Sequence, residues 1–261
     1  MSYTKHMKET EDNFRGTEVL HLEAAYRTDR GRRRENNEDS VLVDAEKGIF
    51  LLADGMGGHQ AGEVASSLAV QEAHFYIKDR LDRVQGDTEM IRLLREAIFY
   101  AHFRIKERAR SDPDLAGMGT TLVIAVFGND TVYIGHVGDS RAYLVYEGMR
   151  QITRDHTVKS YFTGHAFMAR RHLYPQRTHI LTQAVGTSEE LAPEMHSLSF
   201  DPGDILLLCS DGLTDMLTDE EIAAIIRENS GKMEKAAEAL VEEANDKGGR
   251  DNISVILVRK L

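Results

Sequence analysis

The apolar run Ile-Phe-Leu-Leu-Ala-Asp-Gly, residues 49–55, ends in an aspartate beside a glycine, and Ile-Leu-Leu-Leu-Cys-Ser-Asp-Gly, residues 205–212, ends in the same way. Short continuous apolar runs of this kind indicate strands that are buried on both faces. Glycine beside the aspartate lets the backbone and a ligand approach closely, while an uncompensated carboxylate at such a place is costly. A bound cation would compensate Asp54 and Asp211, although each Asp-Gly pair taken alone also fits an ordinary turn.

Two further aspartates lie next to predicted strands. Asp39, in Asn-Asn-Glu-Asp-Ser at residues 36–40, comes just before an early strand, and Asp251, in Gly-Gly-Arg-Asp-Asn at residues 248–252, comes just before the last one. Carboxylate oxygens without a cysteine or histidine cluster favour hard cations such as Mg²⁺ or Mn²⁺ over Zn²⁺. The sequence therefore predicts four strand-edge aspartates that suit a magnesium- or manganese-like ion.

The remaining pattern predicts strands on either side of two long helices, and each helix is expected to press one apolar face on a sheet. The apolar positions are Val64, Leu68 and Phe75 in the first helix and Met90, Leu94, Ala97, Ala101 and Ile105 in the second. Turn residues between three middle strands predict an antiparallel meander over 121–127, 131–137 and 142–146. Other strands are expected at residues 22–27, 40–43, 49–53, 205–209 and 253–258. Thr218 with Glu221 predicts a capping box that opens a later helix.

Composition limits the class of protein. The 261 residues are 41% hydrophobic and 29% charged and contain no long uncharged apolar run, which favours a soluble globular domain without a membrane span. Asp plus Glu outnumber Lys plus Arg by 43 to 32, and the net charge of −11 disfavours nucleic acid as a partner. Cys209 stands alone and residues 1–16 lack the features of a secretory signal, so we expect a cytoplasmic protein without disulfides.

Other phosphate chemistries lack their defining residues. The segment Gly-Met-Gly-Thr-Thr at residues 117–121 has no lysine of the kind that a phosphate-binding P-loop requires. A cysteine phosphatase would place arginine six residues after its nucleophile, where this chain has Asp215 after Cys209. Cys209 is therefore expected to be a buried strand residue. The chain also lacks a Gly-x-Ser-x-Gly elbow and a His-Arg-Asp catalytic loop.

Taken in order, the motifs resemble the metal-dependent protein phosphatase family, type 2C or PPM, in its bacterial form. The resemblance covers roughly residues 22 to 259 and rests on six segments: GRRRENNEDS at 31–40, ADGMGGHQAGE at 53–63, GMGTT at 117–121, GDSR at 138–141, SDGLTD at 210–215 and RDN at 250–252. It implies an α+β fold, a four-layer αββα sandwich of two antiparallel β-sheets flanked by helices. We expect a phosphatase domain over residues 21–261, after a flexible leader at residues 1–20 that the polar, mixed-charge start of the chain indicates.

The resemblance assigns roles by motif position. It implies two Mn²⁺ or Mg²⁺ ions and a weaker third, around a water that attacks phosphoserine or phosphothreonine. Paired cations lower the pKa of such a water and neutralise charge on the phosphoryl group. Arg34 matches the phosphate-binding position, where a guanidinium can bind two oxygens. The implied metal ligands are Asp54, Asp211 and Asp251, the Gly55 carbonyl, Asp39 with Glu38 through water, and Asp139, Asp211 and Asp215 at the third ion.

Two features depart from the family pattern. Met56 replaces a histidine that can protonate the leaving group, and His59 and His156 are nearby titratable residues that also fit ordinary loop positions. The flap, at about residues 157–180, diverges in sequence, and no acidic residue occurs between His156 and Ser188. We hypothesise that this flap forms a positive lip that recruits phosphorylated segments, the alternative being a charged face unrelated to substrate.

The expected partners are phosphorylated proteins, among them a cognate serine/threonine kinase or its substrates, and the protein is expected to be a monomer. A catalytically silent family member that serves as a regulatory or binding module is the alternative. Such a module should lose metal-binding carboxylates, and this sequence keeps all of them, which favours an enzyme.

Overall fold

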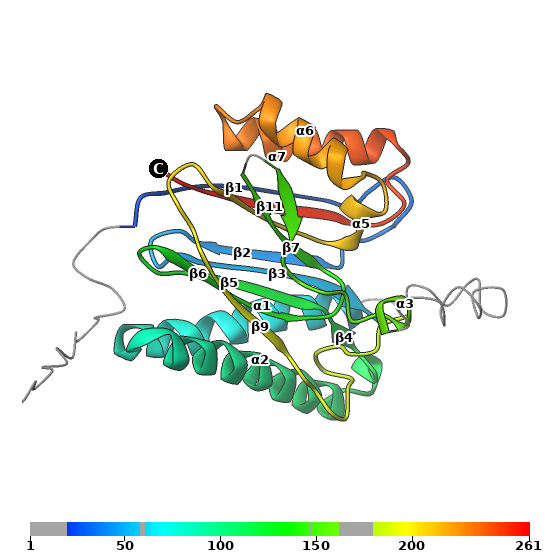
Figure 1. Ribbon diagram of the computed structural model, residues 1–261. Coiled ribbons are helices and arrows are strands. Elements are labelled where there is room, and N and C mark those ends of the chain that lie inside the picture. The colour runs from blue at the N-terminus through cyan, green and yellow to red at the C-terminus, as the bar shows by residue number, and fades with distance from the viewer. Residues whose placement is uncertain (1–19, 58–60, 147, 162–179) are drawn as a thin grey trace, which may run out of the picture.

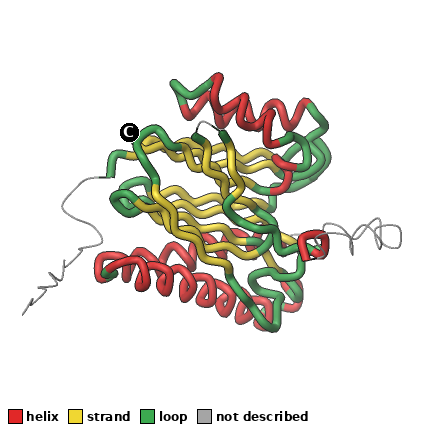
Figure 2. The backbone as a smooth tube through the Cα atoms, viewed as in Figure 1, coloured by secondary structure: helices red, strands yellow, loops and turns green. Residues whose placement is uncertain are grey.

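Four layers make up the protein: helices, a sheet, a second sheet, and helices again (Figure 1). This computed structural model describes residues 20–57, 61–146, 148–161 and 180–261. Figure 2 shows the two layers of strands lying face to face, with helices on both outer faces. The α+β sandwich that the resemblance implied is confirmed.

One sheet contains the Asp54 strand, which lies next to an edge strand of that sheet. Its strands are β2 (Asp39–Asp44), β3 (Ile49–Met56), β5 (Leu122–Phe127), β6 (Thr131–Val137) and β9 (Glu194–Ser199), in the spatial order β2-β3-β5-β6-β9, and the short β4 (Gly119–Thr120) pairs with the end of β3. All neighbouring pairs are antiparallel. Successive residues of β3 face opposite cores, with Leu51 packed toward the helices and Phe50 toward the other sheet. That arrangement explains why the run is apolar at every position.

The other sheet contains the Asp211 strand. Its order is β1 (Leu22–Asp29), β11 (Ile253–Lys260), β10 (Ile205–Cys209), β7 (Arg141–Val145) and β8 (Met149–Gln151). The first and last strands of the described chain are neighbours here, and Leu22 pairs with Lys260. Cys209 lies buried in β10 as a free thiol, as predicted.

Helices cover the two outer faces (Figure 1). α1 (Ala61–Arg80) and α2 (Gly86–Ser111) cover the β3 sheet, while α5 (Asp211–Thr214), α6 (Asp219–Glu228) and α7 (Met233–Asp246) cover the other. The shorter elements are α3 (Val158–Tyr161) and the 3₁₀ turns Leu81–Arg83 and Pro113–Leu115. α6 begins with the predicted capping box, because the Thr218 side chain and Glu221 satisfy each other's backbone N–H groups.

Three details differ from the sequence-based prediction. β7 does not continue the meander of β5 and β6 but crosses to the other sheet, where it pairs with β10. Phe75, expected on the sheet-facing side of α1, is 59% exposed, and the buried stripe of that helix consists mainly of small residues such as Ala65, Ala69 and Ala73. Strand β9 and helix α7 were not predicted.

Several expectations lie outside the described residues. These are the leader up to residue 19, His59, and the flap from residue 162 to 179, including Arg170 and Arg171. Within the described ranges, no helix is both long and apolar enough to cross a membrane.

Candidate metal centre

Asp39 and Asp54 lie directly opposite each other on neighbouring strands, β2 and β3. Thr120, in β4, and Thr121, which follows it, hold the backbone of Asp54. The Thr121 N–H and the Thr120 hydroxyl both donate to the Asp54 carbonyl, at 2.9 and 2.8 Å. In return, Asp54 N–H donates to Thr121 Oγ1 at 2.8 Å. The Gly-Met-Gly-Thr-Thr motif therefore fixes the backbone position of the Asp54 strand end.

Gly55 is required by close packing around its backbone. A Cβ atom at this position would stand 2.1 Å from the Gly62 carbonyl oxygen and 2.7 Å from the Glu38 carbonyl oxygen. The Gly55 N–H donates to the same Glu38 carbonyl at 3.1 Å. Only glycine lets the end of β3 lie this close to the first turn of α1.

The second sheet contributes Asp211 and Asp251. Asp211 is the first residue of α5 and is separated from β10 by Ser210, and Asp251 precedes the neighbouring strand β11. Ser210 links the two sheets, since its hydroxyl donates to Asp39 Oδ2 at 2.8 Å and accepts from Ser254 N–H at 3.0 Å. Carboxylates from both sheets thus meet at one edge of the sandwich.

The third-ion residues are placed differently from one another. Asp139 is buried in the turn between β6 and β7, and the hydroxyl of its neighbour Ser140 hydrogen-bonds Thr121 Oγ1 at 2.7 Å. The charge of Asp211 acts on Asp139. Asp215 is exposed at the end of α5. We name Asp39, Asp54, Asp139, Asp211 and Asp251 together the carboxylate centre.

The carboxylates raise one another's pKa values. Burial, and then the charges of Asp211 and Asp251, raise the pKa of Asp39 to about 7, although serine hydroxyls oppose this shift. Burial and the neighbouring charge of Asp211 raise the pKa of Asp139 to about 7. Burial and the other four carboxylates of the centre raise the pKa of Asp54 well above its ordinary value. Crowded anions of this kind need positive charge to remain ionised together at neutral pH.

Divalent cations fit this donor set. Asp39 Oδ1 is buried and has no hydrogen-bond partner within the described part of the chain, so one carboxylate oxygen is left for a ligand. The donors are oxygens only, which suits Mn²⁺ or Mg²⁺. The roles of individual aspartates and of Gly55 as metal ligands stay predictions.

Arg34 lies at the rim of the carboxylate centre. Its Nη2 donates to Asp251 Oδ2 at 2.6 Å, and its side chain is 48% exposed, so other N–H groups remain available to a ligand. Asn252 anchors the loop that carries Arg34: its side chain donates to the Arg30 and Asn36 carbonyls, both at 2.9 Å, and accepts from Glu38 N–H at 2.8 Å. The sequence placed Asn252 in a motif without revealing this role.

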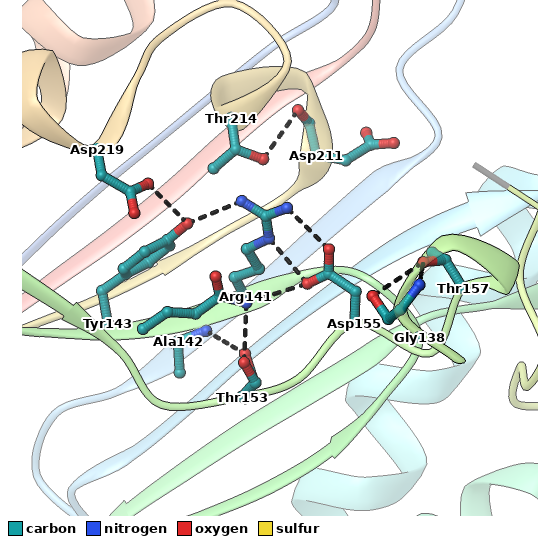
Figure 3. A network of polar contacts seen from close by, with 12 residues as sticks. Gly138, Arg141, Ala142, Tyr143, Thr153, Asp155, Thr157, Asp211, Thr214 and Asp219 are labelled. Atoms are coloured by element: carbon teal, nitrogen blue, oxygen red, sulfur yellow. Dashed lines mark hydrogen bonds and ion pairs between the residues drawn. The ribbon is translucent and has the colours of Figure 1, made fainter. Parts of the chain in front are cut away.

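A partly buried ion pair supports the turn behind Asp139. Arg141 donates from Nε and Nη2 to the two oxygens of Asp155, each at 2.8 Å (Figure 3). Arg141 also donates to the Tyr143 hydroxyl, which in turn donates to Asp219 at the start of α6. Figure 3 shows Asp211 above this network. The arginine of the Gly-Asp-Ser-Arg motif is therefore a structural link between β7, the loop before α3 and α6, which the sequence alone did not indicate.

Met56 and Glu38 also lie beside the carboxylate centre. Met56 ends β3 opposite Gly119, so the position next to Asp54-Gly55 is a thioether. Burial of Glu38 raises the pKa of its carboxyl, the positive charge of Arg34 opposes this, and Asp251 adds to it. Glu38 packs against Gly62.

Comparison with known proteins gives one consistent result. The family model described as Protein phosphatase 2C matches residues 28–257. The chain is 39% identical over 245 residues to the serine/threonine phosphatase stp of Listeria welshimeri, an alignment that covers 92% of this chain and 96% of that protein. The crystal structure of the Mycobacterium tuberculosis serine/threonine phosphatase PstP/Ppp is similar with a TM-score of 0.80 at 36% identity, covering 92% and 98% of the two chains.

A further solved structure bears on the metal. The catalytic domain of the serine threonine protein phosphatase PstP, determined in complex with 2 manganese ions, is similar with a TM-score of 0.77. The two chains are 35% identical, and the match covers 99% of that chain and 92% of this one.

Proposed function

The chain belongs to the protein phosphatase 2C family, and on that premise we propose that it hydrolyses phosphoserine and phosphothreonine esters in proteins, using divalent cations held by the carboxylate centre. The observation that carries the proposal is the convergence of four aspartates from two sheets: Asp39, Asp54, Asp211 and Asp251. The guanidinium group of Arg34, which can bind a phosphate, lies at their rim. A silent family member would have no need to keep so costly a cluster.

Asp54, Asp211 and Asp251, with the Gly55 carbonyl, would hold the ions directly, and Asp39 would act through water. Bound Mn²⁺ or Mg²⁺ would supply a water nucleophile of lowered pKa and neutralise charge on the phosphoryl group. The protein's own task is to fix the carboxylates in place. Thr120 and Thr121 do so by holding the backbone of Asp54, and Ser210 does so by donating to the Asp39 carboxylate.

Arg34 would bind the phosphate. Its Nη2 is held by Asp251, and the remaining N–H groups can donate to phosphate oxygens in a planar array. Asn252 hydrogen-bonds residues on both sides of Arg34 in its loop and directly follows Asp251 in the chain. It therefore holds the Arg34 loop close to Asp251. Met56 cannot donate a proton, so the leaving group must take its proton from elsewhere.

One assay panel tests the proposal. Phosphate release from a phosphothreonine peptide is measured with Mn²⁺, with Mg²⁺ and with a chelator, for the wild type and for Asp54→Asn. We expect turnover with a cation, none with the chelator, and none for the variant. Turnover that survives either the chelator or Asp54→Asn would contradict the proposal, and a folded wild type that is inactive with both cations would favour the regulatory module.

The same proposal covers the cellular role of the enzyme. Such an enzyme acts on proteins that a serine/threonine kinase has modified, so we propose a role in signalling opposite a cognate kinase. A monomer in the cytoplasm is consistent with the single, buried and free Cys209. We further propose that the catalytic domain spans residues 21–261, with residues 1–20 as a leader and about 157–180 as the flap.

A further inference from the structure

A second group of potential metal ligands differs in chemical type from the carboxylate centre, because it contains two histidines. His136 on β6 and Glu194 on β9 are direct partners in the antiparallel register, and His156 packs beside them. One nitrogen from each imidazole and one carboxylate oxygen lie within 4.8 Å of one another. We name His136, His156 and Glu194 the histidine cluster.

His136 is oriented like a metal ligand. Its Nε2 lies 2.8 Å from the Gly138 carbonyl oxygen, which can only accept, so Nε2 carries the ring proton. Nδ1 then presents a lone pair, and this buried atom has no hydrogen-bond partner within the described ranges. Metal-binding histidines commonly donate their other N–H to a backbone carbonyl in this way. Because the residue is fully buried, no bulk water is available to satisfy Nδ1.

The Nδ1 lone pair of His136 faces the carboxylate of Glu194, whose oxygens are also electron-rich. His136 Nδ1 lies 4.0 Å from Glu194 Oε2, and His156 Nε2 lies 3.7 Å from Glu194 Oε1. His196 Nε2 is also 3.6 Å from Oε2. Burial, and then the charge of His156, lowers the pKa of His136 to about 3, so its imidazole is neutral at physiological pH. A neutral Nδ1 facing a carboxylate is favourable only with a cation or a bridging donor between them.

We propose that the histidine cluster binds one divalent transition-metal ion of the Zn²⁺ type through His136 Nδ1, His156 Nε2 and Glu194. Ligands at about 2.1 Å from a tetrahedral ion stand about 3.4 Å apart, so the side chains need to close by less than about 1.5 Å. Two imidazoles and a carboxylate suit Zn²⁺, Co²⁺ or Ni²⁺, whereas the oxygen-only centre suits Mg²⁺ and Mn²⁺. The two sites should therefore select different metals.

An ion can reach the histidine cluster from solvent. A cavity of about 540 Å³ is lined by His156 and Glu194. Thr182 and Gln183 line the same cavity. The space leaves room for a water as the fourth ligand, as in open three-ligand zinc sites.

Binding would alter the turn that carries Asp139. His156 Nδ1 now accepts from Gly138 N–H at 3.2 Å, which places the His156 proton on Nε2. Ligation through Nε2 moves that proton to Nδ1, where it meets the Gly138 N–H, so the hydrogen bond is lost. The Gly138–Asp139 turn is then expected to shift, which couples the histidine cluster to the carboxylate centre.

The test uses Co²⁺ as a coloured probe on the untagged full chain, stripped with chelator and then saturated with Mg²⁺ to occupy the oxygen-only centre. Four-coordinate Co²⁺ with nitrogen ligands absorbs strongly in the visible range, whereas six-coordinate Co²⁺ with oxygen ligands absorbs weakly. We expect a strong band that saturates at one equivalent. His136→Asn and Glu194→Gln should each weaken the Co²⁺ affinity by at least about 10-fold, because each removes a direct ligand.

Two control variants sharpen the result. His74→Gln removes a different histidine–carboxylate pair, in which His74 Nε2 lies 2.8 Å from Asp44, and should leave the band unchanged. Asp54→Asn should abolish phosphatase activity yet keep the band, so that a failure of the proposed function is distinguishable from a failure of this site. Glu194 is 34% exposed, so Glu194→Gln is expected to fold even if the buried His136→Asn does not.

Three results would overturn the proposal: no strong band in the wild type, a band that persists unchanged in Glu194→Gln, or a band lost in Asp54→Asn. Nuclear magnetic resonance of ¹⁵N-labelled protein gives an independent readout with diamagnetic Zn²⁺. We expect His136 Nδ1 and His156 Nε2 to show metal-bound shifts and the Gly138 amide to move. An unchanged Gly138 amide on Zn²⁺ saturation would exclude ligation through His156.

Discussion

At the scale of single residues, Asp211 interacts with three other members of the carboxylate centre. Its charge acts on Asp39, Asp54 and Asp139. We predict that Asp211→Asn abolishes turnover and leaves the fold intact, because the substitution removes one negative charge from a site that must attract cations while keeping side-chain shape. Phosphate release and circular dichroism are the measurements.

The control for Asp211→Asn is Asp114→Asn, which neutralises an exposed aspartate in a 3₁₀ turn. It should retain wild-type turnover. Activity of Asp211→Asn that is preserved at saturating Mn²⁺ would refute the proposed role of Asp211 as a metal ligand.

Asp44 gives a pH-dependent prediction away from the metal sites. Burial opposes its ionisation, but His74 at 2.8 Å, the Lys47 N–H and Lys78 outweigh this and lower the pKa of Asp44. The unfolded chain, with an aspartate pKa of about 4, therefore binds the proton more tightly than the folded protein. The stabilising effect is present above about pH 4 and is lost as the pH falls through the folded-state pKa.

We expect wild type to be more stable than Asp44→Asn at about pH 6 and this difference to shrink below about pH 4. Urea unfolding across the pH series measures it. A difference between the two proteins that does not vary with pH would show that the Asp44 charge contributes nothing.

At the scale of elements, the contact between β3 and the start of α1 depends on Gly55. The added methyl group of Gly55→Ala would overlap the Gly62 and Glu38 carbonyl oxygens, which are backbone atoms that cannot rotate away. We predict a loss of about 1–3 kcal/mol in the free energy of unfolding, typical of overpacking, together with reduced turnover. Gly231→Ala is the matched control, since an added Cβ meets nothing within 4 Å there. Equal effects of the two substitutions would contradict this account.

At the scale of the whole molecule, the core between the sheets supports the site from a distance. Phe127 is 1% exposed, and its ring contacts Phe50 and Phe200 edge to face with centroids 5.4 and 5.0 Å apart. It ends β5, about 17 Å along the strand from Leu122, which follows the threonines that hold Asp54. We predict that Phe127→Ala lowers the free energy of unfolding by about 3–5 kcal/mol.

The turnover number of Phe127→Ala should stay within about twofold of wild type at a temperature where the variant is folded, because the substitution is remote from the carboxylate centre. Denaturant unfolding and initial rates are measured on the same preparation. A large loss of turnover in folded protein would show that the core sets the site geometry directly.

Long-range charge leads to a prediction about substrate capture. The chain carries a net charge of −11, yet residues 157–187 contain no Asp or Glu. If this segment steers phosphorylated substrates, replacing Arg170 and Arg171 by glutamine should raise KM for phosphopeptides more than KM for a small aryl phosphate. Steady-state kinetics on both substrates, at low and high salt, make the comparison. Equal effects on the two substrates would count against recruitment.

The strands that carry the aspartates were predictable from local sequence. Apolar runs specify buried strands by their composition alone, and the glycine after each aspartate marks a close approach that the packing around Gly55 and Gly212 shows. The Thr218 capping box was predictable for the same reason, since its partners are three residues apart. β9 was missed because it is a mostly half-buried edge strand with polar residues, which gives no clear apolar signal.

The sequence by itself therefore determined that the apolar runs leading to Asp54 and Asp211 are buried strands, and that aspartate oxygens at their ends suit hard cations. Only the tertiary structure decided that β7 joins the second sheet, that Phe75 faces solvent, that Ser210 bridges to Asp39, and that His136 faces Glu194. The physical reason is the sequence separation of the residues that interact. Periodicity and turn chemistry act between near neighbours, whereas Ser210 and Asp39 are 171 positions apart and meet only when two sheets pack face to face.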